Sequence, residues 1–123
     1  MCLSRVGKLI PHKVGYKILD RDYNLKDWFT SQYYFAKNFH YTYGFKYDAH
    51  AKGRTVKTIY PNSDGQPYKE GFHYYLRLKD AKVICYFEND VIAKIIVEDN
   101  IACGTEGIFK VGVSRFMTIV KIY

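Results

Sequence analysis

The sequence predicts an α+β fold, with an antiparallel sheet of five or more strands and one principal helix. Two observations predict it. Aromatic residues alternate with other residues from Phe39 to Tyr47, and β-branched residues fill 91–97 and 116–123. A period of two residues is typical of a half-buried strand, and β-branched runs favour strands as well. The chain of 123 residues is long enough for one core, so we expect residues 1–123 to form a single domain.

Three strands are predicted in the first half of the chain, with turns between them. Turn-forming residues gather at 20–24, at 48–54 and at 61–67, where two prolines flank an Asp-Gly pair. Gly44 lies within the strictly alternating aromatic segment and indicates a bulge there. The predicted strands are 16–19, 39–47 and 55–60.

The principal helix is predicted over 75–87. Apolar residues in this segment fall on one helical face, and Asp80 lies in the early turns, where a carboxylate suits the helix dipole. Three strands follow, at 91–97, 109–113 and 116–123. We expect an acidic turn at 98–100, a glycine-flanked connection at 101–107, and a joint at Ser114 and Arg115.

The composition is basic and aromatic. The net charge is +7, and the chain contains 13 Tyr and 8 Phe. Surfaces that hold phosphates and stack bases have this composition. Tyrosine-rich sheets that lysines keep in solution have it too, so composition alone leaves both interpretations open. The positive charge excludes mimicry of DNA.

The three cysteines are far apart and odd in number, which argues against a disulfide framework and favours a cytoplasmic setting. The first residues contain no long apolar stretch, so we expect no secretory signal. Apolar runs stay far below eighteen residues, so we expect no membrane partner.

Known catalytic and phosphate-binding motifs are absent from the sequence, and the four histidines are widely spaced. We therefore expect no catalytic residues, no metal and no cofactor. His73 has two interpretations, a general base or a hydrogen-bonding structural residue, and the second is much the commoner.

Arginines are fewer than lysines in this chain, so each one is a candidate for a bidentate contact with a phosphate. Arg77 opens the predicted helix, and Arg115 stands between Ser114 and Phe116. The alternative for Arg115 is an exposed arginine in a hairpin turn.

Four short segments resemble small phage proteins, in particular the Thoeris anti-defence sponge family. They are Met1-Cys2-Leu3-Ser4, Gly15-Tyr16-Lys17, Gly71-Phe72-His73 with Asp80-Ala81, and Gly112-Val113-Ser114-Arg115-Phe116-Met117. The aromatic region from Trp28 to Tyr47 has no counterpart in this resemblance.

The resemblance implies a non-enzymatic phage protein in the host cytoplasm that sequesters cyclic ADP-ribose isomers made by bacterial TIR-domain defence enzymes. It also implies a homo-oligomer, a dimer or larger, with pockets shared between protomers, and for some members a second site for cyclic oligonucleotides. The sponge function agrees with the residues, because it needs aromatic faces and arginines but no catalytic apparatus. From the chemistry near the matched segments we expect a nucleotide-binding site made of Arg115, Arg77, Phe72, Tyr74, Phe116, Asn89 and Asn100.

Two other functions stay open at this point. A nucleotide-processing enzyme would need paired histidines or a well-placed glutamate, and His73 is isolated in the sequence. A small phage accessory protein that binds nucleic acid would fit the charge of +7. We expect the cyclic nucleotide as the partner and do not expect nucleic acid.

Overall fold

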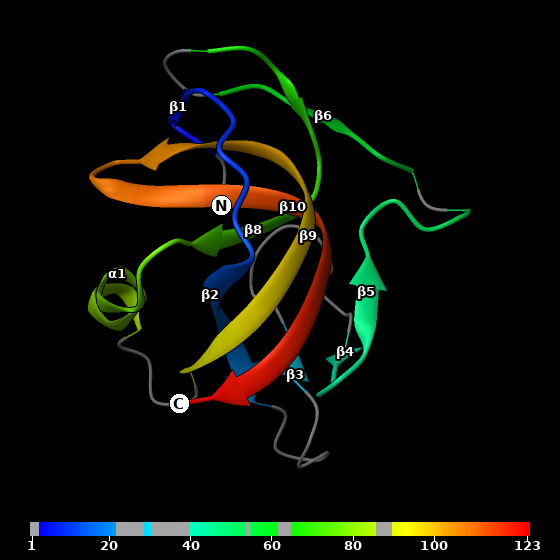
Figure 1. The fold of residues 1–123 in the computed structure, drawn as a ribbon, viewed down its shortest axis with the longest axis vertical. Coiled ribbons are helices and arrows are strands. Elements are labelled where there is room, and N and C mark those ends of the chain that lie inside the picture. Colours follow the sequence, from blue (N-terminus) through cyan, green and yellow to red (C-terminus); the bar gives the residue numbers. More distant parts are fainter. Residues whose placement is uncertain (1–2, 22–28, 31–39, 54, 62–64, 86–89) are drawn as a thin grey trace.

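The computed structural model describes all residues except 1–2, 22–28, 31–39, 54, 62–64 and 86–89 (Figure 1). Most of the described chain is antiparallel strand, and α1 is the helix within it. The elements are β1 (Arg5–Val6), β2 (Val14–Arg21), β3 (Phe29–Thr30), β4 (His40–Tyr41), β5 (Lys46–Asp48), β6 (Thr58–Ile59), β7 (Tyr68–Lys69), β8 (Phe72–Tyr75), α1 (Leu78–Ile84), β9 (Asp90–Glu106) and β10 (Phe109–Ile122). The α+β fold class, with its antiparallel sheet and one principal helix, is confirmed.

Among the described residues, eight strands form one sheet in the order β1-β9-β10-β8-β2-β3-β4, with β5 added to β10. A further pairing joins β9 to β2, so that β9, β10, β8 and β2 form a closed ring of paired strands. The link between β8 and β2 is a single pair, Tyr75 with Tyr16. β6 and β7 make a separate two-stranded sheet.

The long hairpin of β9 and β10 is the central element of the fold, and it bends in the middle (Figure 1). Its tip turns at Gly107, where φ is 59°, and its register shifts between Val113 and Ser114. On one side of the bend β9 pairs with β2 and β10 pairs with β5. On the other side β9 pairs with β1 and β10 pairs with β8. The bend lets one hairpin contribute to both halves of the sheet.

This hairpin corrects three expectations. The predicted turn at 98–100 and the predicted connection at 101–107 are mostly strand, because β9 continues to Glu106. The strands predicted at 109–113 and 116–123 are one strand, β10. Asp99 lies inside β9 with a φ of 57°, close to the register shift opposite Val113 and Ser114, and aspartate tolerates this backbone conformation better than most residues.

The strand predicted at 39–47 is also wrong. β4 ends at Tyr41 and pairs with β3, whereas β5 begins at Lys46 and pairs with β10. Gly44, with a φ of 77°, turns the chain between them, and residue 39 lies outside the described residues. Gly44 therefore belongs to a turn between two short strands and not to a bulge within one strand.

The helix is shorter than predicted. α1 spans Leu78–Ile84, since Tyr75 still belongs to β8 and Arg77 has extended backbone angles at the N-cap. At its other end the helix stops before Cys85, and 86–89 lie outside the described residues. Among the described residues, no helix has the length and apolarity that a membrane crossing requires.

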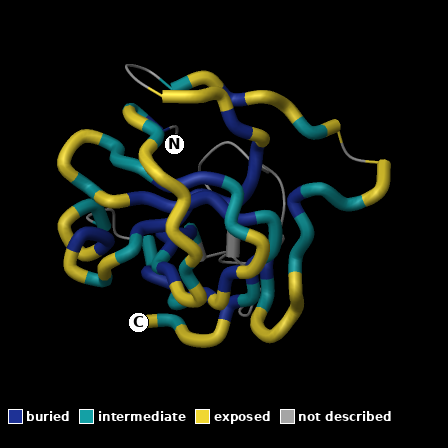
Figure 2. The backbone as a smooth tube through the Cα atoms, turned by 45° about the horizontal axis from the view of Figure 1, so that its top comes forward, coloured by how far each residue is buried: buried dark blue, intermediate teal, exposed yellow. Residues whose placement is uncertain are grey.

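Two clusters of buried side chains form the core. The buried residues lie toward the middle of the molecule (Figure 2). The first lies between the paired strands and includes Leu19, Ile95, Met117 and Tyr74. The second lies on the other face of the strands, where Ala81 of α1 packs in the same cluster as residues such as Ile18, Ile92, Tyr75 and Val111.

Candidate functional site

The residues that the sequence analysis placed in one site lie in separate parts of the structure. Arg115 and Phe116 are on β10, beside β5. Arg77 precedes α1, and Phe72 and Tyr74 are buried on β8. Asn100 is on β9, and Asn89 lies outside the described residues. The structure therefore does not bring the six described residues together into one pocket.

Arg115 is already paired with a carboxylate. Its Nε donates to Oδ1 of Asp48 at 2.9 Å, and its Nη2 donates to Oδ2 at 3.1 Å. This bidentate pair lowers the pKa of Asp48 and raises that of Arg115. The bidentate contact that the sequence analysis expected for a phosphate is made here with Asp48 on β5.

Two cationic groups lie over the Phe116 ring beside this pair. The Arg115 guanidinium lies 4.8 Å from the ring centre and the Lys46 ammonium 4.7 Å from it. Lys46 also contacts Glu98 at 2.6 Å. Asp48 and Glu98 compensate both cations, so this region offers little net attraction for a phosphate.

Arg77 also has a carboxylate partner, since its Nε donates to Oδ2 of Asp80 at 3.0 Å. Asp80 is buried in the first turn of α1, and Arg77 is its exposed ion-pair partner. This ion pair joins the N-cap residue Arg77 to the first turn of α1. Phe72 is 1% exposed and packs in the core, so its ring faces are covered by protein.

Tyr74 and Asn100 belong to a chain of hydrogen bonds. The Tyr74 hydroxyl donates to Oδ1 of Asn100 at 2.6 Å, and Nδ2 of Asn100 donates to the backbone carbonyl of His12 at 2.9 Å. Burial raises the pKa of the Tyr74 hydroxyl, so it stays a donor. These two predicted residues support the segment before β2, and this segment lines a cavity.

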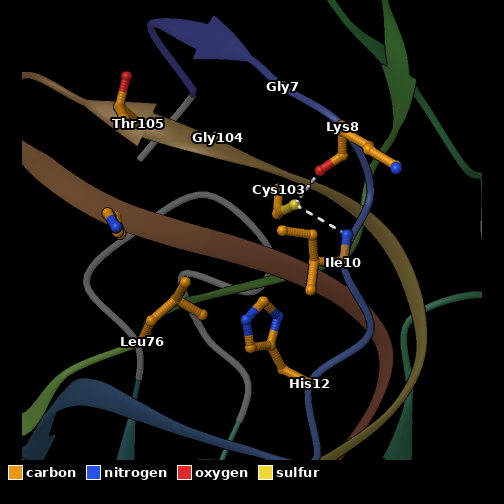
Figure 3. Close-up of a pocket in the computed structure, with 9 residues that line it drawn as sticks. Gly7, Lys8, Ile10, His12, Leu76, Cys103, Gly104 and Thr105 are labelled. Atoms are coloured by element: carbon orange, nitrogen blue, oxygen red, sulfur yellow. Dashed lines mark hydrogen bonds between the residues drawn. The ribbon is translucent and has the colours of Figure 1, made fainter.

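The cavity has a volume of about 280 Å³ and lies between the N-terminal segment, the end of β9 and the start of β10 (Figure 3). Ile10, His12, Leu76 and Cys103 gather around it in Figure 3. The volume is a little under the roughly 300–1,000 Å³ that is usual for small-molecule sites. The residues that line it are Gly7, Lys8, Ile10, His12, Leu76, Cys103, Gly104, Thr105 and Lys110.

The N-terminal wall of this cavity is fixed to β9 mainly through Cys103. The Gly7 amide donates to the Cys103 carbonyl at 2.9 Å, the Cys103 thiol donates to the Lys8 carbonyl at 2.9 Å, and the Ile10 amide donates to the Cys103 sulfur at 3.3 Å. β1 approaches Gly104 so closely that a Cβ there would meet the Arg5 carbonyl oxygen at 1.8 Å. Only glycine at position 104 allows this packing.

The charged groups of the cavity wall are all basic. Lys8 lines it from the segment between β1 and β2, Lys110 lines it from β10, and His12 closes one side. None of the described residues that line the cavity is Asp or Glu. Nδ1 of His12 is buried and has no hydrogen-bond partner among the described residues. A buried nitrogen without a partner in a cavity wall indicates a position that a ligand atom can fill.

His73 lies in a buried network outside this cavity. Its Nε2 contacts the Tyr68 hydroxyl at 3.0 Å, and its Nδ1 contacts the Gly71 carbonyl at 3.2 Å. The Tyr68 hydroxyl accepts from the Leu3 amide at 3.0 Å. Burial lowers the pKa of His73 to about 3, so the ring is neutral at physiological pH. These contacts favour the structural interpretation of His73.

The cavity residues carried no recognisable signal in the sequence. Lys8, His12, Cys103 and Lys110 are up to 102 positions apart in the chain and follow no motif. Only the pairing of β1 with β9 and the bend of the hairpin bring them together. Among the described residues, no group of three His, Cys, Asp or Glu side chains is placed to hold a metal ion.

Comparison with known proteins gives no relative from which a role could be transferred. No family model, no curated protein and no solved structure matches the chain.

Proposed function

We propose that this protein binds a small phosphate-bearing ligand in the cavity between its N-terminal segment and β9, and holds it without chemical conversion. The observation that carries the proposal is the basic wall of the cavity. Lys8 and Lys110 can neutralise a phosphate, and the buried Nδ1 of His12 can take a further hydrogen bond. Ile10 and Leu76 offer apolar contact for the uncharged part of the ligand.

Binding without conversion is supported by the chemistry of the wall. A general acid–base pair would need a carboxylate or a second histidine within reach. The described lining residues contain one histidine and no carboxylate, and the Cys103 thiol is hydrogen-bonded to the Lys8 carbonyl.

The ligand class that we propose is a nucleotide of the cyclic ADP-ribose type. The resemblance to the sponge family supports this ligand class. With such a ligand, the protein would act as a phage anti-defence factor that keeps a TIR-produced signal from its receptor. The volume of about 280 Å³ holds part of such a nucleotide, so the remainder would project through the mouth of the cavity.

The proposal is tested by mixing the protein with cyclic ADP-ribose, removing unbound nucleotide by filtration, releasing the bound fraction with heat, and identifying it by chromatography. We expect depletion of the free nucleotide and its recovery intact. A changed product would instead support the nucleotide-processing enzyme. Lack of depletion across a panel of cyclic and linear adenine nucleotides would overturn the proposal.

Variants locate the site. Lys110→Gln and Lys8→Gln should each weaken binding by about tenfold or more, since a charge-assisted hydrogen bond contributes roughly 1.5–3 kcal/mol. Lys52→Gln is the matched control, because Lys52 is exposed and does not line the cavity. Arg115→Ala and Arg77→Ala should leave the affinity nearly unchanged. If these arginine variants lose binding and the lysine variants do not, the site lies at the arginines.

A further inference from the structure

A second surface combines tyrosines with lysines on the other half of the β9–β10 hairpin. Tyr16 of β2 pairs with Lys94 of β9, and Lys94 pairs with Lys121 of β10. Their neighbours Ala93 and Ile95 are fully buried in the first core cluster, so this row lies on the opposite face of the strands. On that face Tyr16 is half-buried against the second cluster, Lys94 is half-buried and Lys121 is exposed. The row crosses three strands and spans about 10 Å.

Tyr123 extends this row. Its amide donates to the Ile92 carbonyl at 2.9 Å, which holds the residue against β9. Its ring centre lies 6.3 Å from that of Tyr16, and the Lys121 ammonium lies 4.7 Å from the Tyr123 ring centre. Tyr123 is 45% exposed to solvent, at the C-terminal end of the chain that is marked in Figure 2.

Apolar residues flank the row on the same face. Val14 pairs with Ile96 across β2 and β9, and both are more than a third exposed. We call the surface formed by Tyr16, Lys94, Lys121, Tyr123, Val14 and Ile96 the tyrosine–lysine face.

Neither Lys94 nor Lys121 has an ion pair with any of the described residues, and the contact of Lys121 is with the Tyr123 ring. Farther along β9, Glu98 is already paired with Lys46. The face therefore presents unpaired positive charge beside two aromatic rings.

We propose that the tyrosine–lysine face binds single-stranded nucleic acid. Aromatic rings stack on bases of any sequence, and lysines neutralise the backbone phosphates between them. A duplex hides the faces of its bases, so a single strand gains contacts here that a duplex of equal charge lacks. This proposal goes beyond nucleotide binding in the cavity, uses none of its residues, and replaces the sequence-based expectation that nucleic acid is not a partner.

The test is fluorescence anisotropy with a labelled 15-mer of thymidine and with a duplex of the same length, over a series of salt concentrations. We expect the single strand to bind more tightly than the duplex. In Lys94→Gln/Lys121→Gln the slope of log K against log salt should fall by about 1.4, since each phosphate contact contributes about 0.7 for single strands. Tyr123→Leu should weaken binding roughly 5- to 100-fold without changing the slope, and Tyr123→Phe should retain it.

Lys52→Gln/Lys69→Gln is the matched control, because both lysines are exposed and lie outside the face. It should leave the affinity and the slope unchanged. Equal binding of single strand and duplex with no effect of Tyr123→Leu would show a general attraction to polyanions and would overturn the proposal. Absence of binding at 50 mM salt, or an equal loss in the control variant, would overturn it as well. All these outcomes are independent of cyclic nucleotide binding, which the cavity variants report separately.

Discussion

Lys17 places an amine in the interior of the protein. It is 6% exposed, and its one hydrogen bond among the described residues is donated to the His73 carbonyl at 2.8 Å. Burial lowers the pKa of Lys17 to about 8 from 10.5. Below pH 8 the amine is charged in both the folded and the unfolded state, and the folded state carries the full cost of burying that charge. Between pH 8 and 10.5 the unfolded chain binds more protons, so the free energy of unfolding rises with pH.

Replacing the amine by an apolar group of similar length should remove this dependence. We expect Lys17→Met to be more stable than the wild type at pH 7 and to lose the rise in stability between pH 8 and 10. Urea unfolding at pH 7, 8, 9 and 10 measures this, with Lys52→Met as the exposed control. The range stops at pH 10 because Tyr74, whose pKa is raised by burial, reverses the sign above it. A Lys17→Met variant that keeps the rise would contradict the assignment to Lys17.

His73 affects the free energy of unfolding at acidic pH, whereas Lys17 affects it at alkaline pH. Its pKa is about 3 in the folded protein and 6.5 in a model peptide, mainly because burial disfavours the imidazolium. The unfolded chain therefore binds the extra proton between pH 6.5 and 3, and stability is lost as the pH falls through this window. We expect His73→Gln to show a smaller drop in melting temperature from pH 7 to pH 4.5 than the wild type. His50→Gln, which changes the other described histidine of this region, should keep the wild-type drop; an identical drop in all three proteins would rule out His73 as its source.

The roles of several single residues could not be predicted from the sequence. His73 was given two interpretations from the sequence, and its buried hydrogen bonds favour the structural one. Lys17 was taken as part of an ordinary strand, and nothing in Gly15-Tyr16-Lys17 distinguishes an inward lysine from an outward one. Arg115 and Arg77 were assigned to a ligand because their carboxylate partners, Asp48 and Asp80, could not be identified without the fold.

At the scale of elements, β8 is held between β2 and β10 by one ring and two glycines. A Cβ at Gly15 would lie 2.2 Å from Cδ2 of Tyr74, and a Cβ at Gly112 would lie 2.4 Å from its Cζ. The Tyr74 ring therefore lies against the backbones of β2 and β10. Glycine is required at both positions because the ring occupies the space of a side chain.

We expect Gly15→Ala to destabilise the protein by about 1–3 kcal/mol, the usual cost of overpacking a core. The cost should shrink in a Tyr74→Leu background, where the smaller side chain leaves room for the added methyl group. A double-mutant cycle measured by urea unfolding gives the coupling directly. Gly53→Ala is not a suitable control because its φ is 87°, whereas Gly7→Ala adds a Cβ with no atom closer than 3.9 Å and serves well. Equal costs of Gly15→Ala in both backgrounds would contradict the packing described.

The elements differ in how far the sequence predicted them. β-branched runs correctly indicated strand at 91–97 and 116–123, because these residues favour extended backbone and pack against the core clusters. Turn-like residues misled the prediction at Asp99 and Gly104. Asp99 takes a positive φ beside the bulge in β9, and Gly104 allows the close approach of β1, and both leave the strand continuous. Turn residues and bulge residues share the same backbone preferences, so only the partner strands distinguish them.

At the scale of the whole molecule, the bent hairpin separates two surfaces of different chemistry. The cavity lies where the end of β9 meets the N-terminal segment, and the tyrosine–lysine face lies where the start of β9 meets the end of β10 (Figure 1). Both are basic, in keeping with a net charge of +7. This separation allows each surface to be changed without altering the other.

Large apolar side chains remain open to solvent over the described surface. Phe45 is 64% exposed, Tyr60 71%, and Ile108 85%. Tyr43 and Phe45 lie beside the end of β10, where Tyr43 bridges to Ile119 and Val120 is 45% exposed. Apolar side chains that gather on a surface usually mark contacts with another molecule. A homo-oligomer therefore stays our prediction for the assembled protein.

We expect light scattering after size exclusion to give the mass of a dimer or a larger assembly at micromolar concentration. The association should persist at 1 M salt, because burial of apolar area is not screened, whereas pairing between the charged surfaces would fade. Phe45→Ser should lower the mass or the association constant if the residues beside β10 form the contact, and Tyr60→Ser tests the β6 side in the same way. A monomer mass at every concentration would contradict the prediction, and it would confine the ligand to groups that one copy of the chain supplies.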